Sequence, residues 1–135
     1  MTTTAAAASV RRHTETYPAE PEQVRHARAA LAGWLDGCPR ADEAILIASE
    51  FATNSVLHSA SRDGGAFTLR AEVCPARLRI EVEDGGGPWR DGPGRDDRPH
   101  GLDVVAAIVG PGNWGIEGDA RGRIAWARLG RVRCA

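Results

Sequence analysis

The chain has 135 residues, and its 17 basic side chains nearly balance its 18 acidic ones, giving a formal net charge of −1. All 17 basic residues are arginine, which excludes a Walker-A loop, a Val-Ala-Ile-Lys kinase strand and Schiff-base catalysis, because each needs a lysine. The near-zero charge argues against a dedicated nucleic-acid binder, and a hydrophobic content of 42% is typical of a globular domain. Any phosphate must therefore be held by arginine, backbone N–H groups, a helix N-terminus or a metal.

The same composition predicts one soluble domain. Residues 1–8 are small and polar and are expected to be a disordered tail, with a single domain over residues 9–135. Cys38, Cys74 and Cys134 form no CxxC pair, so we expect reduced thiols and neither a disulfide framework nor a zinc site. With no apolar run near the ~18 residues of a membrane helix and no signal-peptide pattern, we expect a cytoplasmic protein without a membrane partner.

The N-terminal half predicts a strand and two helices. Residues 9–16 alternate in character and suggest an edge strand, which Tyr17-Pro18 should end. From Glu22, apolar residues recur at three- and four-residue spacing, which predicts a helix that Gly37 and Pro39 close. A second helix is expected from Ala41 to about Ser59.

The C-terminal half predicts four strands and one helix. Alternating residues over 66–73 and 77–83 predict a hairpin, and the glycine- and proline-rich stretch 84–101 is too broken for regular structure. A short apolar helix follows over 101–109, and strands are expected at 114–117 and 123–129. This order favours an α+β two-layer sandwich, with helices on one face of a mixed, largely antiparallel sheet.

The second helix carries a polar stripe on an otherwise apolar surface. Glu50, Asn54 and His58 are spaced i, i+4, i+8 and share one side of the helix. One interpretation is a solvated stripe. The other is a pocket wall, with Glu50 as a general base and Asn54 as an oxygen ligand for Mg²⁺.

Two later segments could contact a ligand. In Asp84-Gly85-Gly86-Gly87-Pro88, the glycines allow a close backbone approach, and Asp84 could accept a hydrogen bond from an exocyclic amine, although such a sequence is often only a turn. In Pro99-His100-Gly101-Leu102-Asp103, a helix begins, and its N-terminus could hold an anion. Arg90, Arg95 and Arg98 could add positive charge from the preceding loop.

Taken together, these motifs resemble the Bergerat ATP-binding fold of the GHKL superfamily, which includes gyrase, heat-shock chaperone, histidine kinase and mismatch-repair ATPases. The ten residues from Ser49 to His58 (SEFATNSVLH) resemble its N box, and Glu83 to Pro88 resembles its first glycine box. Within that superfamily the chain is similar, over about residues 9–129, to small stand-alone actinobacterial regulators related to anti-sigma-factor serine kinases.

The resemblance implies a role for each matched position. Glu50 would be the catalytic base that activates the attacking hydroxyl, and Asn54 would hold Mg²⁺ against the triphosphate of ATP. Asp84 would bind the adenine amine, and Gly86 would allow the base to approach. Gly101 and Leu102 would begin the helix whose N-terminus meets the phosphates, with residues 87–100 as a lid.

The sequence departs from the family pattern at two positions. Pro99 replaces the first glycine of the second glycine box and should stiffen the lid hinge. Ile124 stands two residues before Trp126, where the family commonly has a threonine that supports the adenine-binding aspartate. Loss of that hydrogen bond should cost on the order of 1 kcal/mol and weaken nucleotide binding several-fold.

The resemblance implies a serine/threonine kinase that transfers the γ-phosphoryl group of ATP to a small anti-sigma-factor antagonist and sequesters a sigma factor, with no direct nucleic-acid partner. Related kinases tend to form homodimers. Two alternatives stay open: a non-catalytic ATP-binding or protein-interaction module without turnover, and a scaffold that needs no ATP.

Overall fold

A computed structural model describes residues 10–58, 64–86, 100–119 and 121–130. The expected tail over residues 1–8 and the expected lid over residues 87–99 lie outside this part of the chain, as do Arg90, Arg95, Arg98 and Pro99. Within the described ranges, no helix has both the length and the apolar character that membrane crossing requires.

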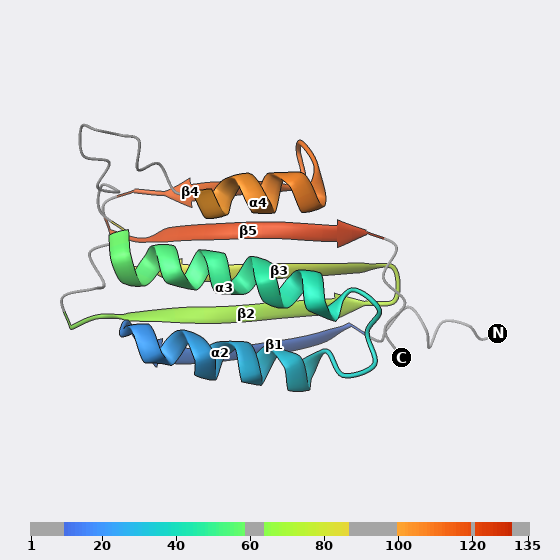
Figure 1. The fold of residues 1–135 in the computed structure, drawn as a ribbon, viewed down its shortest axis with the longest axis horizontal. Helices are drawn as coiled ribbons and strands as arrows, with labels where there is room; N and C mark the ends of the chain where they lie inside the picture. The colour runs from blue at the N-terminus through green and yellow to red at the C-terminus, as the bar shows by residue number, and fades with distance from the viewer. Residues whose placement is uncertain (1–9, 59–63, 87–99, 120, 131–135) are drawn as a thin grey trace.

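The fold is α+β in two layers, as predicted from the sequence: helices cover one face of a five-stranded sheet (Figure 1). The strand order is β1-β2-β3-β5-β4, and all four neighbouring pairs are antiparallel, so the described sheet has no parallel pair. The elements are β1 (Arg11–Pro18), α2 (Pro21–Trp34), α3 (Ala41–His58), β2 (Ala66–Cys74), β3 (Arg77–Asp84), α4 (His100–Val109), β4 (Trp114–Gly118) and β5 (Arg123–Gly130).

The core lies between the sheet and the helices. Strand residues alternate between the two faces, and the helix-facing ones, such as Leu69, Ile80 and Leu129, are at most 1% exposed. They pack with Ile47 and Phe51 of α3, which are equally buried. This packing holds α3 across the middle of the sheet, so the polar residues of α3 are fixed relative to the strand ends.

The first strand ends two residues later than the sequence suggested. Tyr17 and Pro18 were expected to end it, yet both belong to β1 and pair with Phe67 and Ala66 of β2. Proline is tolerated there because Pro18 is the last residue of an edge strand, where its missing N–H breaks no internal ladder. Tyr17 is buried and its ring stacks on Phe67, with centroids 5.5 Å apart, which adds a packing reason for the strand to continue.

The loop between α2 and α3 is attached to the end of β5. The Arg40 guanidinium donates to the Gly130 carbonyl at 3.1 Å and also pairs with Glu43 in the first turn of α3. The hydrogen bond from Arg40 holds the pKa of the Glu43 carboxyl below its usual value. The carboxylate also lies near the positive end of the helix dipole, which favours its charged form.

The prediction of three reduced cysteines was wrong. Cys38, which is 7% exposed in the α2–α3 loop, is disulfide-bonded, whereas Cys74 is a free thiol. The partner of Cys38 lies outside the described residues. Spacing along the chain could not indicate this bond, because a disulfide depends on which segments the fold brings close together.

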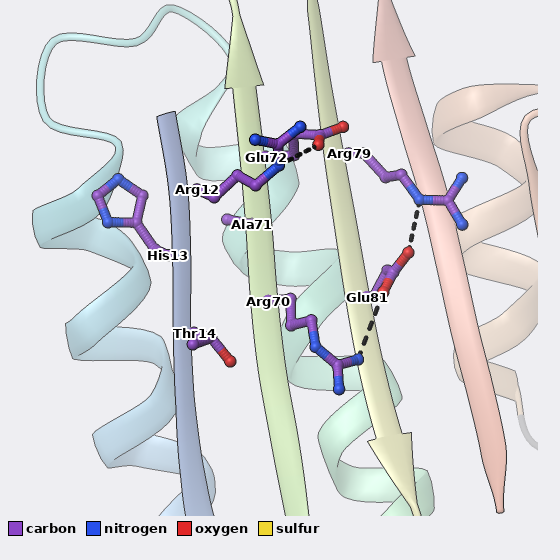
Figure 2. A pocket seen from close by; sticks show the side chains of 8 residues that line it. All are labelled: Arg12, His13, Thr14, Arg70, Ala71, Glu72, Arg79 and Glu81. Carbon is purple, nitrogen blue, oxygen red and sulfur yellow. Dashed lines mark hydrogen bonds and ion pairs between the residues drawn. The ribbon is translucent and has the colours of Figure 1, made fainter. Parts of the chain in front are cut away.

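The other face of the sheet carries a charged network without a covering helix (Figure 2). Arg12 donates to Glu72 at 2.9 Å, and Arg79 donates to Glu81 at 2.7 Å, around a shallow hollow of about 360 Å³. Trp126 continues this face on β5, with the Arg79 guanidinium 4.7 Å from its ring centroid. The arginines of this face thus make ion pairs and an aromatic contact that suit a planar guanidinium.

Candidate functional site

The polar stripe of α3 is partly buried. Asn54 is only 7% exposed, and Glu50, one turn earlier, is half-buried. The side chain of His58 lies outside the described part of the structure. A fully solvated stripe would leave Asn54 accessible, so its burial favours the interpretation of a pocket wall at this end of α3.

Asp84 lies at the end of β3 and is held by two hydrogen bonds. The carboxylate is 8% exposed; its Oδ2 accepts from the Ser55 hydroxyl at 2.6 Å and its Oδ1 from the Gly86 backbone N–H at 2.8 Å. Two donors on a buried carboxylate fix its orientation and offset the cost of burying its charge. The end of β3 and the last turns of α3 are therefore joined in one polar cluster, which contains Ser55, Asp84 and Gly86.

The backbone at Gly86 has a positive φ of 78°, which glycine adopts without strain. Its N–H donates to Asp84 Oδ1. A side chain at this position would be strained. Gly86 therefore has a conformational role in the turn after β3.

One buried amide atom on α3, on the residue before Ser55, lacks a partner. The Nδ2 of Asn54 is buried and makes no hydrogen bond with any residue that the structure describes. Burying a polar atom without a hydrogen bond costs free energy, which a bound ligand could offset. Rotation of the side-chain amide by half a turn exchanges its nitrogen and oxygen, so the same position can present an oxygen ligand. The Asn54 amide therefore fits the preference of Mg²⁺ for oxygen ligands.

The residue opposite Asp84 on β5 is Arg123, whereas Ile124 pairs with Glu83. Burial lowers the pKa of the Arg123 guanidinium, and the nearby Asp84 carboxylate acts in the opposite direction. A hydroxyl donor to Asp84 is supplied by Ser55 of α3.

The start of α4 completes the set of predicted residues. Gly101 and Leu102 lie in its first turn, and Leu102 is partly buried against the core. Asp103, whose charge would repel a phosphate if it pointed inward, is exposed. The helix packs against α3, but no described contact joins Gly101, Leu102 or Glu50 directly to the Asp84 cluster.

Sequence reasoning overlooked Ser55 and Arg123. Ser55 stands directly after Asn54 in the N box, and the periodicity of α3 places it toward the sheet rather than on the polar stripe. A serine on the buried side of an apolar helix needs a hydrogen-bond partner, and that requirement was the available signal. The position of Arg123 opposite Asp84 depends on the register of β3 and β5, which cannot be read from local sequence patterns.

Comparisons with known proteins identify the family and the fold. The sequence model of the histidine kinase-like ATPase domain matches residues 17–117. Among solved structures, the fold is similar to that of the RsbU and RsbW domains of Rv1364c from Mycobacterium tuberculosis, with a TM-score of 0.71 and 24% identity. That match covers 93% of this chain and 34% of the other, so this chain spans about a third of its length. No curated protein matches the sequence.

Proposed function

Because the chain belongs to the histidine kinase-like ATPase family, we propose that it binds ATP with Mg²⁺ and phosphorylates a serine or threonine of a small partner protein. The observation that carries this proposal is the buried carboxylate of Asp84 at the end of β3, which two hydrogen bonds hold in place. It is joined to α3, the helix on which the buried amide nitrogen of Asn54 has no hydrogen-bond partner among the described residues. The solved structure with a similar fold includes an RsbW domain, which is consistent with a regulator of this kind.

Asp84 is the residue proposed to bind the adenine. Its two oxygens accept from Ser55 and Gly86, so the carboxylate is held in place before a nucleotide arrives. A carboxylate oxygen has lone pairs for more than one donor, so Asp84 can also accept a hydrogen bond from the exocyclic amine of adenine. Guanine has a carbonyl at the equivalent position, and this contact therefore favours ATP over GTP.

Asn54 is the residue proposed to hold Mg²⁺, which would neutralise charge on the triphosphate. The start of α4, at Gly101 and Leu102, would present backbone N–H groups to the phosphates. Both contributions are independent of lysine, in agreement with the composition of the chain.

Glu50 is the proposed general base. It lies one turn before Asn54 on the same side of α3 and is half-buried, so its carboxylate is accessible from the pocket side. It would accept the proton of the acceptor hydroxyl as the new oxygen–phosphorus bond forms and ADP leaves.

We place this kinase in the cytoplasm, where the partner would be an anti-sigma-factor antagonist and a sigma factor would be sequestered by the same chain. Two copies of the chain would form a homodimer, as the resemblance implies. These assignments follow the resemblance in sequence and fold.

The test is calorimetric titration of ATP into the wild-type protein, Asn54→Ala and Asp84→Asn, with Mg²⁺ or with EDTA. We expect binding that requires Mg²⁺ in the wild type and is lost in both variants. Thr14→Ala, on the uncovered face of the sheet, should bind like the wild type. The absence of binding at millimolar ATP would contradict the proposal.

The chemical step is tested separately with Glu50→Gln. This variant should bind ATP normally but lose transfer of the γ-phosphoryl group to the partner. Transfer at the wild-type rate would remove Glu50 from its role as base, while ATP binding without any transfer by the wild type would indicate a binding module.

A further inference from the structure

A groove of about 470 Å³ lies between α2 and α3, which run side by side on the helical face of the sheet (Figure 1). The groove has an apolar floor, because Val24 and Val56 line it and are at most 9% exposed. Its rim carries Arg25 and Arg28 from α2 and Leu57 from α3. It therefore combines apolar surface with positive charge, in a place that the Asp84 cluster does not use.

The two rim arginines are available to a partner. Arg25 and Arg28 are exposed and lie one turn apart on the same side of α2. Neither makes an ion pair with a described residue, in contrast to Arg12, Arg70 and Arg79 on the sheet. Glu22 also lines the groove, but one carboxylate against two guanidinium groups leaves the rim positive.

Exposed leucines connect this groove to the proposed catalytic base. Leu46 and Leu57 are 42% and 49% exposed. On α3, Leu46, Glu50, Thr53 and Leu57 have the spacing i, i+4, i+7, i+11 and share one side of the helix. Thr53 and Leu57 line the groove, so Glu50, one turn before Thr53, lies next to its edge without lining it.

We propose that this groove is the docking site for a segment of the phosphoacceptor protein that carries acidic and leucine-like side chains next to the acceptor hydroxyl. The segment is acidic because it complements the exposed Arg25 and Arg28, and it is apolar because it covers the exposed Leu57 above a floor of Val24 and Val56. It belongs to the acceptor because a chain seated there passes beside Glu50. This inference rests on the proposed kinase function, and it adds the chemistry of the substrate.

The test uses a fluorescein-labelled peptide in which one serine is flanked by alternating glutamate and leucine, and the same peptide with glutamine in place of each glutamate. Binding to the full chain is measured by fluorescence anisotropy for the wild type, for the double variant Arg25→Glu with Arg28→Glu, and for Leu57→Ser. Arg11→Glu, an exposed arginine on β1, is the matched control. ATP affinity is measured on the same preparations by calorimetry.

We expect the acidic peptide to bind the wild type at least about fivefold more tightly than the glutamine peptide, since exposed ion pairs contribute only modestly. The double variant should lose this preference, Leu57→Ser should weaken both peptides, and Arg11→Glu should behave like the wild type. ATP affinity should be unchanged in all of them.

The inference is overturned if the acidic peptide does not bind at millimolar concentration, or if binding is equal in the wild type and the double variant. It is also overturned if the double variant alone abolishes a concentration-dependent dimer, because the occupant is then a second copy of the chain. If ATP does not bind while the peptide binds through Arg25 and Arg28, the kinase proposal fails and the groove remains a docking site for an acidic segment.

Discussion

At the scale of single residues, Ser55 links Asp84, the carboxylate proposed to bind adenine, to the helix that carries Glu50 and Asn54. The hydroxyl donates to Asp84 at 2.6 Å, inside a region where both side chains are less than 10% exposed. In Ser55→Ala the carboxylate keeps only the Gly86 N–H among its two described donors. A hydrogen bond to a charged group contributes about 1.5 to 3 kcal/mol, more than a neutral one.

We therefore expect Ser55→Ala to lower the free energy of unfolding by about 1 to 2 kcal/mol and to weaken ATP binding by about fivefold or more. Urea denaturation and calorimetric ATP titration measure the two effects. Thr14→Ala removes a hydroxyl from the uncovered face of the sheet and should change neither. Wild-type stability and affinity in Ser55→Ala would show that the bond does not orient Asp84.

The site residues that lie close together along the chain could be predicted from the sequence, whereas those brought together by strand pairing could not. The spacing of Glu50 and Asn54 and the Asp84 motif could be identified, because each depends on residues close together along the chain. Arg123 could not be assigned to Asp84 in the same way, since that pairing depends on the register of β3 and β5. A shift of one residue in this register would have placed Ile124 there instead.

At the scale of elements, the pair Arg40–Glu43 fixes the start of α3. The pKa of Glu43 is lowered in the folded state, so its charged form stabilises the protein above the unfolded pKa near 4.5. This contribution is lost as the pH falls through the lower folded pKa. The side chain is 45% exposed, so solvent screening limits the contribution of the pair to about 1 kcal/mol or less.

Glu43→Gln should therefore be less stable than the wild type at pH 7, by up to about 1 kcal/mol, and equally stable near pH 3. Urea denaturation at the two pH values measures this difference. Asp42→Asn lies in the same helical turn and loses a dipole interaction without the arginine pair, so its effect at pH 7 should be smaller. A Glu43→Gln deficit that persists at pH 3 would contradict this account.

The elements themselves were predicted well, because periodicity is a local property. The helix expected from Ala41 to about Ser59 is α3, Ala41–His58, and the hairpin over 66–83 is β2 and β3. The boundary error at Tyr17 and Pro18 has a tertiary cause: the aromatic contact between Tyr17 and Phe67 and the edge position of β1 override the local turn signal.

At the scale of the whole molecule, the disulfide of Cys38 constrains the loop that also contacts the end of β5. A disulfide of this kind typically stabilises a domain by about 2 to 4 kcal/mol, mainly by restricting the unfolded chain. Sequence analysis assigned reduced thiols, because an odd number of widely spaced cysteines carries no signal for a bond that only the fold brings together.

We expect a reducing agent to lower the free energy of unfolding of the wild type by about 2 to 4 kcal/mol. Cys38→Ser should show no response to the reductant. Cys74→Ser removes a free thiol and leaves the disulfide intact, so it should respond like the wild type. Guanidinium denaturation with and without dithiothreitol measures the response. Equal sensitivity of Cys38→Ser and the wild type would rule out this bond as the source.

The strand order β1-β2-β3-β5-β4 also suggests which strand pairs form first during folding. Hairpins β2–β3 and β4–β5 are local in sequence and should form within microseconds, whereas the β3–β5 pairing joins distant segments and closes later. That late pairing sets Arg123 opposite Asp84. In a partly folded chain Arg123 is therefore not yet opposite Asp84, the carboxylate proposed to bind adenine.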